Sequence, residues 1–407
     1  MKKQTNLVPK RRFKEFQNAH AWEQRKLGDL GSVAMNKRIF KEQTAETGDV
    51  PFYKIGTFGG EPDAFISREL FEEYKIKYPY PEVGDILISA SGSIGRIVEY
   101  TGKDEYFQDS NIVWLKHDER LDNLFLKQFY SIVKWQGLEG STIKRLYNKN
   151  ILDTRISVPS VTEQLKIGQF FDQLDHLIIL QQRKLEKTKA LKSAYLSEMF
   201  PAEGERVPKR RFAGFTQPWE QRKFSEIATV RRGLTYKPSD ITENGIRVLR
   251  SSNINEDTFE LRSDDVFVKK DAVNIEPVKE NDILITSANG SSRLVGKHAL
   301  INGIKTNMVH GGFMLLASSM QPYFVNALMS SSWYNKFINV YVSGGNGAIG
   351  NLSKGDLESQ IIYTPSEDEQ IKIGNFFKRL DEIITLHQRK LEKLQNLKKA
   401  YLNEMFV

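Results

Sequence analysis

The sequence contains no cysteine, which excludes both a disulfide framework and a thiolate metal site. It also has no long apolar run. The stretch LIIL at 177–180 is among the longest, far below the roughly 20 residues that a transmembrane helix needs. The start, MKKQTNLVPKRRF, is basic but has no apolar stretch behind it, as a secretory signal would require. These absences predict a cytoplasmic protein without a membrane segment.

Catalytic motifs are missing as well. None of the six histidines belongs to an H-E-x-x-H pair, and no D/N-P-P-Y/F tetrapeptide of an amino-methyltransferase occurs. SGSIG at 91–95 has Gly and Ser in the wrong order for a nucleophile elbow. A G-x-G-x-x-G match at Gly345, Gly347 and Gly350 lacks a following helix of adequate length and a counterpart in the first half of the chain. We therefore expect no active site, no metal site and no small-molecule substrate.

What is present is ordinary globular material. The 407 residues are 40% hydrophobic and 27% charged, which is enough for two domains of common size. The formal net charge is +8 and the sequence pI is about 9.2. This excess is modest for the length of the chain, and it favours a polyanionic partner.

The strongest signal is an internal repeat. VPKRRF at 8–13 returns at 207–212, WEQRK at 22–26 returns at 219–223, and a long segment at 163–200 returns at 369–406. The sequence between these anchors differs: YKIGTFGGEPDAF at 53–65 has no recognisable match near VLRSSNINEDTF at 248–259. The chain therefore consists of two tandem copies of one set of shared segments, which we call the frame. The sequence between these segments differs from one copy to the other. We interpret its basic leaders as solvated linkers, and Trp22 and Trp219 as core anchors.

The repeated long segment predicts a helix. Its apolar residues alternate steps of three and four, a heptad seam that also carries Gln181, His387 and two lysines. Each copy begins with Pro and a Ser-x-x-Glu capping box, Ser160 to Glu163 and Ser366 to Glu369. The sequence favours an intramolecular antiparallel pair, and pairing with the helices of another subunit remains open. The expected coiled-coil residues are Phe171, Leu174, Ile178, Leu185, Tyr195, Met199, Phe377, Leu380, Ile384, Leu391, Leu394, Tyr401 and Met405.

Between the helices the sequence predicts two mixed α/β domains, so the fold class is α+β with a pseudo-twofold tandem repeat. GDILIS at 84–89 and NDILIT at 281–286 are typical of strands, while 123–136 and 322–338 have helical apolar spacing. The predicted boundaries are a basic leader at 1–21, a first domain at 22–159, a first long helix at 160–200, a linker and second leader at 201–218, a second domain at 219–365 and a second long helix at 366–407.

The polar loops of both domains suit contact with DNA. Arg and Lys reach guanine edges, Asn and Gln reach adenine edges, and hydroxyls or amides bind phosphates. The candidates in the first domain are Lys54, Thr57, Phe58, Ser89, Ser91, Ser93, Arg96, Thr142, Lys144, Arg145, Tyr147 and Lys149. Those in the second domain are Arg231, Arg232, Tyr236, Lys237, Arg250, Ser251, Ser252, Asn253, Ser287, Asn289, Ser291, Ser292, Arg293, Asn346 and Lys354. Taken singly, each of them has the ordinary alternative of a solvated loop residue.

The order of leader, variable domain and long helix, written twice, resembles the specificity subunit of bacterial type I restriction-modification enzymes. The similarity covers essentially the whole chain and is most specific in E-Q-x-K-I-G-x-F-F-x-x-L-D followed by QRKLEK at 182–187 and 388–393. The resemblance implies two target-recognition domains, each reading one half of a split, asymmetric site on double-stranded DNA. It also implies that the paired helices act as a spacer.

The same resemblance implies partners and a division of labour. Two modification subunits would carry S-adenosylmethionine and methylate adenine, and two restriction subunits would add ATP- and Mg-dependent translocation and cleavage. The chain itself would be non-catalytic and would bind no cofactor. Two other classes remain open: a coiled-coil scaffold with no DNA role, and a nucleic-acid-modifying enzyme that acts alone.

Overall fold

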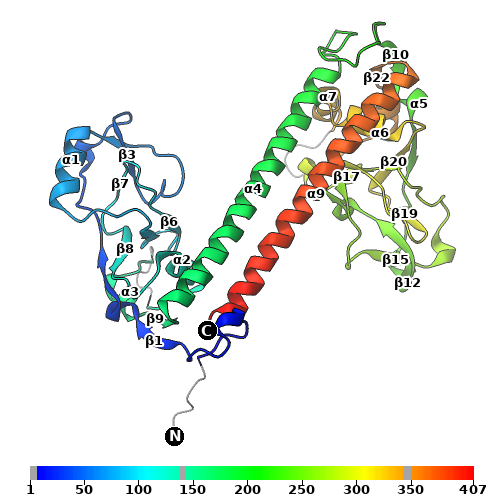
Figure 1. Cartoon of the computed structure of the whole chain (residues 1–407). Helices are drawn as coiled ribbons and strands as arrows, with labels where there is room; N and C mark the ends of the chain where they lie inside the picture. Colours follow the sequence, from blue (N-terminus) through cyan, green and yellow to red (C-terminus); the bar gives the residue numbers. More distant parts are fainter. Residues whose placement is uncertain (1–6, 138–143, 343–349) are drawn as a thin grey trace. The chain divides into compact units, whose positions relative to one another are not determined.

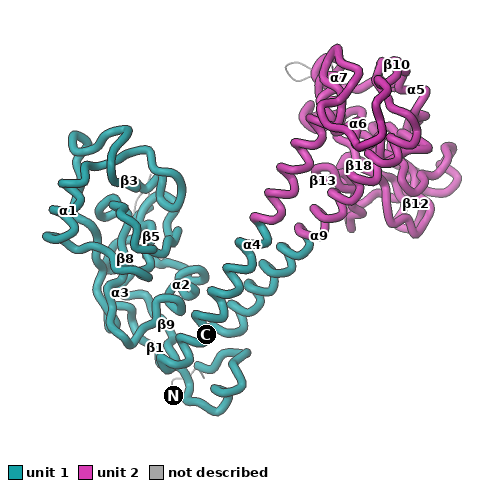
Figure 2. The backbone as a smooth tube through the Cα atoms, turned by 45° about the horizontal axis from the view of Figure 1, so that its top comes forward, with its two compact units in different colours: residues 1–182, 389–407 teal, residues 183–388 magenta. Residues whose placement is uncertain are grey.

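The computed structural model describes residues 7–137, 144–342 and 350–407, and the chain folds as two compact units. The first unit consists of 1–182 and 389–407, and the second consists of 183–388 (Figures 1 and 2). Two helices of 39 residues each, α4 (Val161–Met199) and α9 (Glu367–Met405), have parts in both units. Within the described residues, no helix is both long and apolar enough to cross a membrane.

The remaining elements divide between the units. The first unit contains η1 (Lys14–Phe16), β1 (Glu23–Lys26), η2 (Leu27–Asp29), β2 (Gly31–Ala34), η3 (Lys41–Gln43), β3 (Val50–Tyr53), β4 (Phe65–Ile66), α1 (Arg68–Lys77), β5 (Ile86–Ser89), β6 (Ile97–Glu99), β7 (Tyr106–Phe107), β8 (Ile112–His117), α2 (Asn123–Ile132), α3 (Asn148–Asp153) and β9 (Arg155–Val158).

The second unit contains β10 (Glu220–Lys223), α5 (Phe224–Ile227), β11 (Thr229–Arg232), η4 (Pro238–Asp240), β12 (Ile241–Leu249), η5 (Ser251–Asn253), β13 (Ile254–Asn255), β14 (Thr258–Phe259), β15 (Val266–Val268), η6 (Lys270–Ala272), β16 (Ile283–Thr286), β17 (Ala288–Asn289), η7 (Ser292–Leu294), β18 (His298–Leu300), β19 (Met308–His310), β20 (Met314–Ser318), α6 (Pro322–Met329), α7 (Ser332–Tyr341), β21 (Gly350–Asn351), α8 (Lys354–Glu358) and β22 (Ile361–Thr364).

Three sheets recur in both units, and the second unit has two additional two-stranded sheets, β13-β14 and β17-β21. A four-stranded sheet has the order β2-β8-β5-β6 in the first unit and β11-β20-β16-β18 in the second. A three-stranded sheet follows as β4-β3-β7 and as β15-β12-β19, with its middle strand antiparallel to one neighbour and parallel to the other in both units. The EQRK repeats form the two edge strands β1 and β10, which pair with β9 and β22. The duplicated frame therefore includes strands whose sequences show no recognisable similarity.

Each unit buries its own hydrophobic core, centred on a repeated tryptophan. Trp22 is 3% exposed and its ring lies edge-on to Phe125 and Phe406, while Trp219 is fully buried beside Phe200 and Phe324. The prediction that both tryptophans anchor domain cores is confirmed. Phe406 and Phe200 follow the last turns of α9 and α4, so each core includes the end of a long helix.

The long helices pair antiparallel within each unit. In the first unit Phe170 packs against Tyr401 and Asp175 binds Lys398. Residue numbers therefore increase along α4 while those of the contacting residues on α9 decrease. In the second unit Tyr195 packs against Phe376, and Lys192 binds Asp381 at 2.6 Å. Every predicted coiled-coil residue is buried or half-buried. The favoured intramolecular antiparallel pairing is therefore what both units contain.

The basic leaders are not solvated linkers, contrary to the sequence interpretation. The Arg12 guanidinium binds the Glu163 carboxylate at the first turn of α4, and Arg211 binds Glu369 in the same way on α9. Glu163 and Glu369 are fully buried. The Glu163 N–H donates to Ser160 Oγ at 3.4 Å, which is one half of the predicted capping box, and both oxygens of each carboxylate accept from arginine.

One predicted helical segment is in fact two helices. The apolar spacing at 322–338 continues, but α6 ends at Met329 and α7 begins at Ser332. Ser330 Oγ donates to the Asn326 carbonyl and Ser331 Oγ donates to the Leu328 carbonyl. Serine hydroxyls that bond to nearby backbone compete with helix continuation, which explains the break.

Candidate nucleic-acid interface

In the first unit, four connections converge at one edge of the sheets, which we call the first loop edge: 54–60, 90–96, 108–111 and 144–147. The Ile55 N–H donates to Gln108 Oε1 at 2.9 Å, and the Ala90 N–H donates to the Asn111 carbonyl at 2.7 Å. Leu146 N–H donates to the Ala90 carbonyl at 2.8 Å. These bonds hold connections distant in the sequence against one another.

Polar side chains form a network at the first loop edge. Arg145 Nη2 donates to Ser110 Oγ and to Asn111 Oδ1, both at 3.0 Å, and Ser91 Oγ donates to Asn111 Oδ1 at 2.7 Å. Ser110 has φ of 52°, a left-handed conformation that costs a non-glycine residue energy. Arg96 Nη1 donates to the Phe58 carbonyl at 2.8 Å, which ties in the remaining connection.

The second unit has an equivalent second loop edge, made of 250–253, 287–293, 311–313 and 350–353. Ser287 N–H donates to the Phe313 carbonyl at 2.9 Å, and Leu352 N–H donates to the Ser287 carbonyl at 2.7 Å. Asn289 Nδ2 donates to Ser251 Oγ at 3.1 Å. Three of the connections follow equivalent strands in the two units and the fourth precedes α3 or α8, yet they present different side chains.

Several predicted contact residues are structural instead. Phe58 is fully buried, and Ser89 is 1% exposed with its hydroxyl donating to the Ser93 carbonyl. Asn253 is fully buried, and its amide donates to the Glu260 carbonyl and to Asp265 Oδ1. Ser91 and Ser287 are also buried. Turn-forming residues of this kind fold the loops, which leaves their side chains unable to reach a groove from these positions.

The other predicted residues are accessible to different degrees. Ser93, Arg96, Lys144, Tyr147, Lys149, Arg232, Lys237, Ser252, Ser291, Ser292 and Arg293 are exposed. Lys54, Thr57, Arg145, Arg231, Tyr236, Arg250, Ser251, Asn289 and Lys354 are half-buried. Thr142 and Asn346 lie outside the described residues. For all the residues named in this paragraph, contact with DNA remains a prediction.

Three predicted residues of the second unit share one hollow. Arg231, Arg232 and Lys354 line this hollow between β11 and α8. Arg231 is held there by Glu276 at 3.2 Å and Asp282 at 3.3 Å. The Arg231 charge is therefore engaged with carboxylates outside the four connections, and Lys354 pairs with Glu358 at 3.5 Å.

The sequence interpretation missed five residues that the fold brings to the edges. Arg38 pairs with Asp109 at 2.9 Å beside the Ser110 and Asn111 turn of the first edge. Phe313 lies on the corresponding turn of the second edge and is 72% exposed. No local motif marked them, because the turns between β7 and β8 and between β19 and β20 differ completely in sequence.

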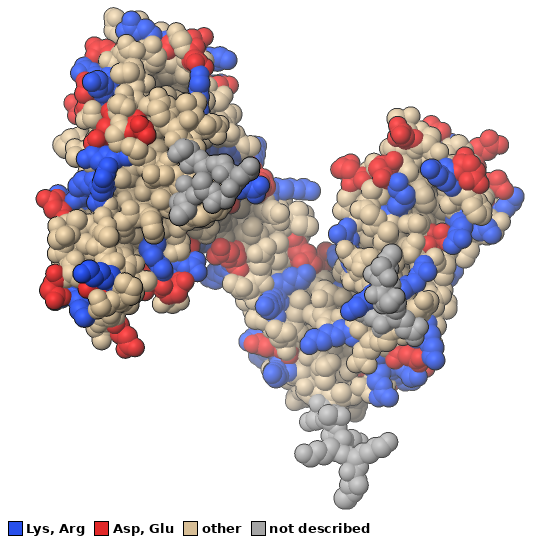
Figure 3. Space-filling view, turned by 180° about the vertical axis from the view of Figure 1, so that it is seen from behind, with Lys and Arg blue, Asp and Glu red and all other residues tan. Residues whose placement is uncertain are grey.

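Charges of both signs are mixed over the face in Figure 3, with Lys and Arg interspersed among Asp and Glu on each unit. On that face, a single-signed field does not define the interface. Hydrogen-bonding side chains at the loop edges are therefore the better indicator of where DNA bases would be recognised. Base edges are recognised through hydrogen bonds and local apolar contacts.

Comparison with known families decides the assignment. A family model described as the type I restriction modification DNA specificity domain matches the chain twice, at residues 20–190 and 216–396. The chain belongs to this specificity family. Each match extends from the second part of a leader through one domain and into its long helix, which agrees with the duplicated frame.

Individual relatives support the family assignment. A Haemophilus influenzae protein that carries the provisional name of a type I restriction enzyme specificity subunit is 59% identical over 152 residues, 37% of this chain and 40% of that protein. A type I restriction enzyme specificity subunit of Methanocaldococcus jannaschii is 22% identical over 78% of this chain and 77% of its own length. The crystal structure of the type I S subunit from M. genitalium shares the fold, with a TM-score of 0.66, 16% identity and coverage of 98% and 99% of the two chains.

Proposed function

We propose that this chain is the DNA-recognition subunit of a type I restriction-modification complex, and that each loop edge reads one half of a bipartite, asymmetric site. The observation that carries this proposal is the convergence of the same four connections in both units with different side chains. A shared frame supplies the same mode of approach to DNA, and different side chains supply different half-sites.

The long helices would set the distance between the half-sites. At about 1.5 Å per residue, a 39-residue helix spans roughly 58 Å, and both helices run without interruption from one unit into the other. Insertion of one heptad near 188–191 would then change the gap in the recognised sequence and leave the bases of each half unchanged.

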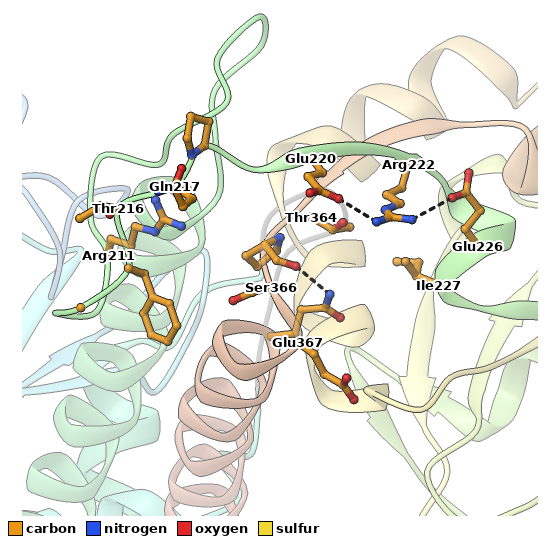
Figure 4. A pocket seen from close by; sticks show the side chains of 15 residues that line it. Arg211, Thr216, Gln217, Glu220, Arg222, Glu226, Ile227, Thr364, Ser366 and Glu367 are labelled. Carbon is orange, nitrogen blue, oxygen red and sulfur yellow. Dashed lines mark hydrogen bonds and ion pairs between the residues drawn. The ribbon is translucent and has the colours of Figure 1, made fainter.

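The repeated frame would also dock two modification subunits at two equivalent surfaces. The EQRK residues of β1 and β10 are identical and all exposed, although exposed residues need not be identical for two units to fold. Beside β10 a hollow is lined by the second leader and the first turn of α9, and Figure 4 shows Arg222 linking Glu220 to Glu226 there. Charge reversal at Arg25 and Arg222 should weaken binding of the modification subunits while each unit stays folded.

The chain would contribute no catalysis of its own. In this proposal S-adenosylmethionine is carried by the modification subunits, which methylate adenine, and ATP with Mg by the restriction subunits, so the chain binds no cofactor. The assembled complex would act on DNA in the cytoplasm.

The decisive experiment is co-expression of this chain with its modification subunits in a methylation-free host, followed by genome-wide mapping of modified adenines. A bipartite motif with an unspecified gap is expected, and exchange of 22–159 for the domain of a relative should change one half only. A single continuous motif, or a change in both halves, would overturn the proposal. A DNA-independent scaffold would give no methylation, and an enzyme acting alone would modify DNA without the partner subunits.

A further inference from the structure

Phe313 is an aromatic side chain left in water at the second loop edge. At 72% exposure it is the most exposed aromatic in the part of the chain that the structure describes. Burying a phenylalanine side chain is worth roughly 1.5–3 kcal/mol, so this ring contributes little to the stability of the free protein. The same edge also contains Ser251 and Asn289, which are hydrogen-bonded to each other at 3.1 Å.

The backbone that carries the ring is fixed. The Phe313 carbonyl accepts hydrogen bonds from Ser287 N–H at 2.9 Å and Ala288 N–H at 3.1 Å. Gly311 N–H donates to the Leu249 carbonyl at 2.9 Å, and a Cβ on Gly233 would come within 1.9 Å of the Gly311 oxygen. The turn at 311–313 therefore packs closely against neighbouring backbone. The exposed Phe313 ring is attached to a backbone that these contacts fix in place.

The first loop edge has a polar residue at the corresponding place. There the carbonyl of Asn111 accepts the N–H of Ala90, as the carbonyl of Phe313 accepts that of Ser287. Asn111 is engaged through its side chain with Ser91 and Arg145, whereas the Phe313 ring stays exposed. The two edges therefore differ in chemistry at one shared position.

We infer that Phe313 recognises a thymine in the half-site read by the second unit, through apolar contact between its ring and the 5-methyl group. This inference rests on the proposed function. The thymine methyl is the apolar feature of the major groove, and phenylalanine is among the side chains that contact it. The hydroxyl of Ser251 and the amide of Asn289 at the same edge suit the hydrogen-bonding edges of adjacent bases.

The test uses the complex of this chain with its modification subunits and duplexes that carry the mapped site. Each thymine of the second half-site is replaced singly by deoxyuridine, which removes only the methyl group. For the wild-type complex, one replacement should weaken binding about three- to tenfold. For Phe313→Ala, binding to the unmodified site should fall by a similar factor, and the same deoxyuridine should have no further effect.

Met320→Ala is the matched control, because Met320 is 90% exposed and lies beyond the opposite end of β20 from Phe313. It should bind as wild type does, and the thermal stability of both variants should match the wild type. A second half-site without thymine, unchanged binding by Phe313→Ala, or independent effects of the two changes would overturn the inference. If the wild-type complex recognised no bipartite site at all, the proposed function itself would have failed.

Discussion

Arg12 and Glu163 face each other as a two-point ion pair, with Nε–Oε1 at 2.7 Å and Nη2–Oε2 at 2.6 Å, although 151 residues separate them in the chain. Their side chains are only 6% and 1% exposed. The geometry is the parallel arrangement that makes arginine–carboxylate pairs strong. Arg211 and Glu369 repeat it in the second unit, so each long helix is fastened at its first turn to a leader.

Removal of the arginine should destabilise the first unit strongly. Arg12→Ala leaves the Glu163 carboxylate buried without its partner, a change that costs about 3–5 kcal/mol. Urea unfolding monitored by tryptophan fluorescence measures the loss. Arg11→Ala is the control, because Arg11 is half exposed and pairs with Glu404 at the surface, where ion pairs contribute little. Equal losses for the two variants would contradict the assignment of Arg12 as a buried anchor.

Gly168→Ala should destabilise the protein even though alanine is the better helix former. At an open helical position this change gains about 1 kcal/mol. Here the added Cβ would lie 2.7 Å from Leu124 Cβ and 2.9 Å from the Phe125 nitrogen, so α2 must move away from α4, at a cost of about 1–3 kcal/mol. Thermal unfolding should show a lower midpoint. Gly56→Ala, with nothing within 4 Å of the new methyl, should leave the midpoint nearly unchanged.

Arg145 and Lys149 should affect DNA binding in different ways. Arg145 is held over the first loop edge by Ser110 and Asn111, so Arg145→Gln should cost about 1–3 kcal/mol and relax specificity in the first half-site alone. Lys149 is exposed, and Lys149→Gln should weaken binding to all sequences and lower the salt slope by about 1. Binding titrations at several salt concentrations, with sites altered in one half at a time, separate the two outcomes. A loss of specificity in the second half from Arg145→Gln would refute this reading.

The second unit should lose stability in mild acid. Burial lowers the pKa of His310 to about 4, below its ordinary value near 6.5. Between these values the unfolded chain binds a proton that the folded chain does not, so stability present above pH 6.5 is lost as the pH falls towards 4, by up to about 3 kcal/mol. Unfolding measured across this range should show a smaller slope for His310→Gln than for wild type. His20→Gln, at an exposed position, should keep the wild-type slope.

The sequence was sufficient for the features that repeat or that follow a local period. The strands at Ile86–Ser89 and Ile283–Thr286, both long helices, and the tryptophan anchors follow from alternation, heptad spacing and duplication. These features depend on contacts between residues close in the sequence or on identical sequence in the two halves of the chain. Both can be recognised in a single sequence.

The loop edges could not be assembled from the sequence. Strands β3 and β12 take the same place because backbone hydrogen bonds with β7 and β19 set their position, and backbone bonds leave no signature in side-chain identity. The sequence around Ser89 and Asn253 did not indicate that these side chains would hydrogen-bond to nearby backbone carbonyls and so stabilise their own turns. The leader arginines find partners far along the chain, which no local pattern encodes.

Each unit closes its hydrophobic core around its own tryptophan and its own strands. Recombination that replaced one variable segment of the gene would therefore leave the buried side chains of the other unit in place. Mutations at one loop edge would likewise be free of packing constraints from the other. A lineage could thus acquire a new half-site without rebuilding the half it already recognises, so its target sequence would change one side at a time.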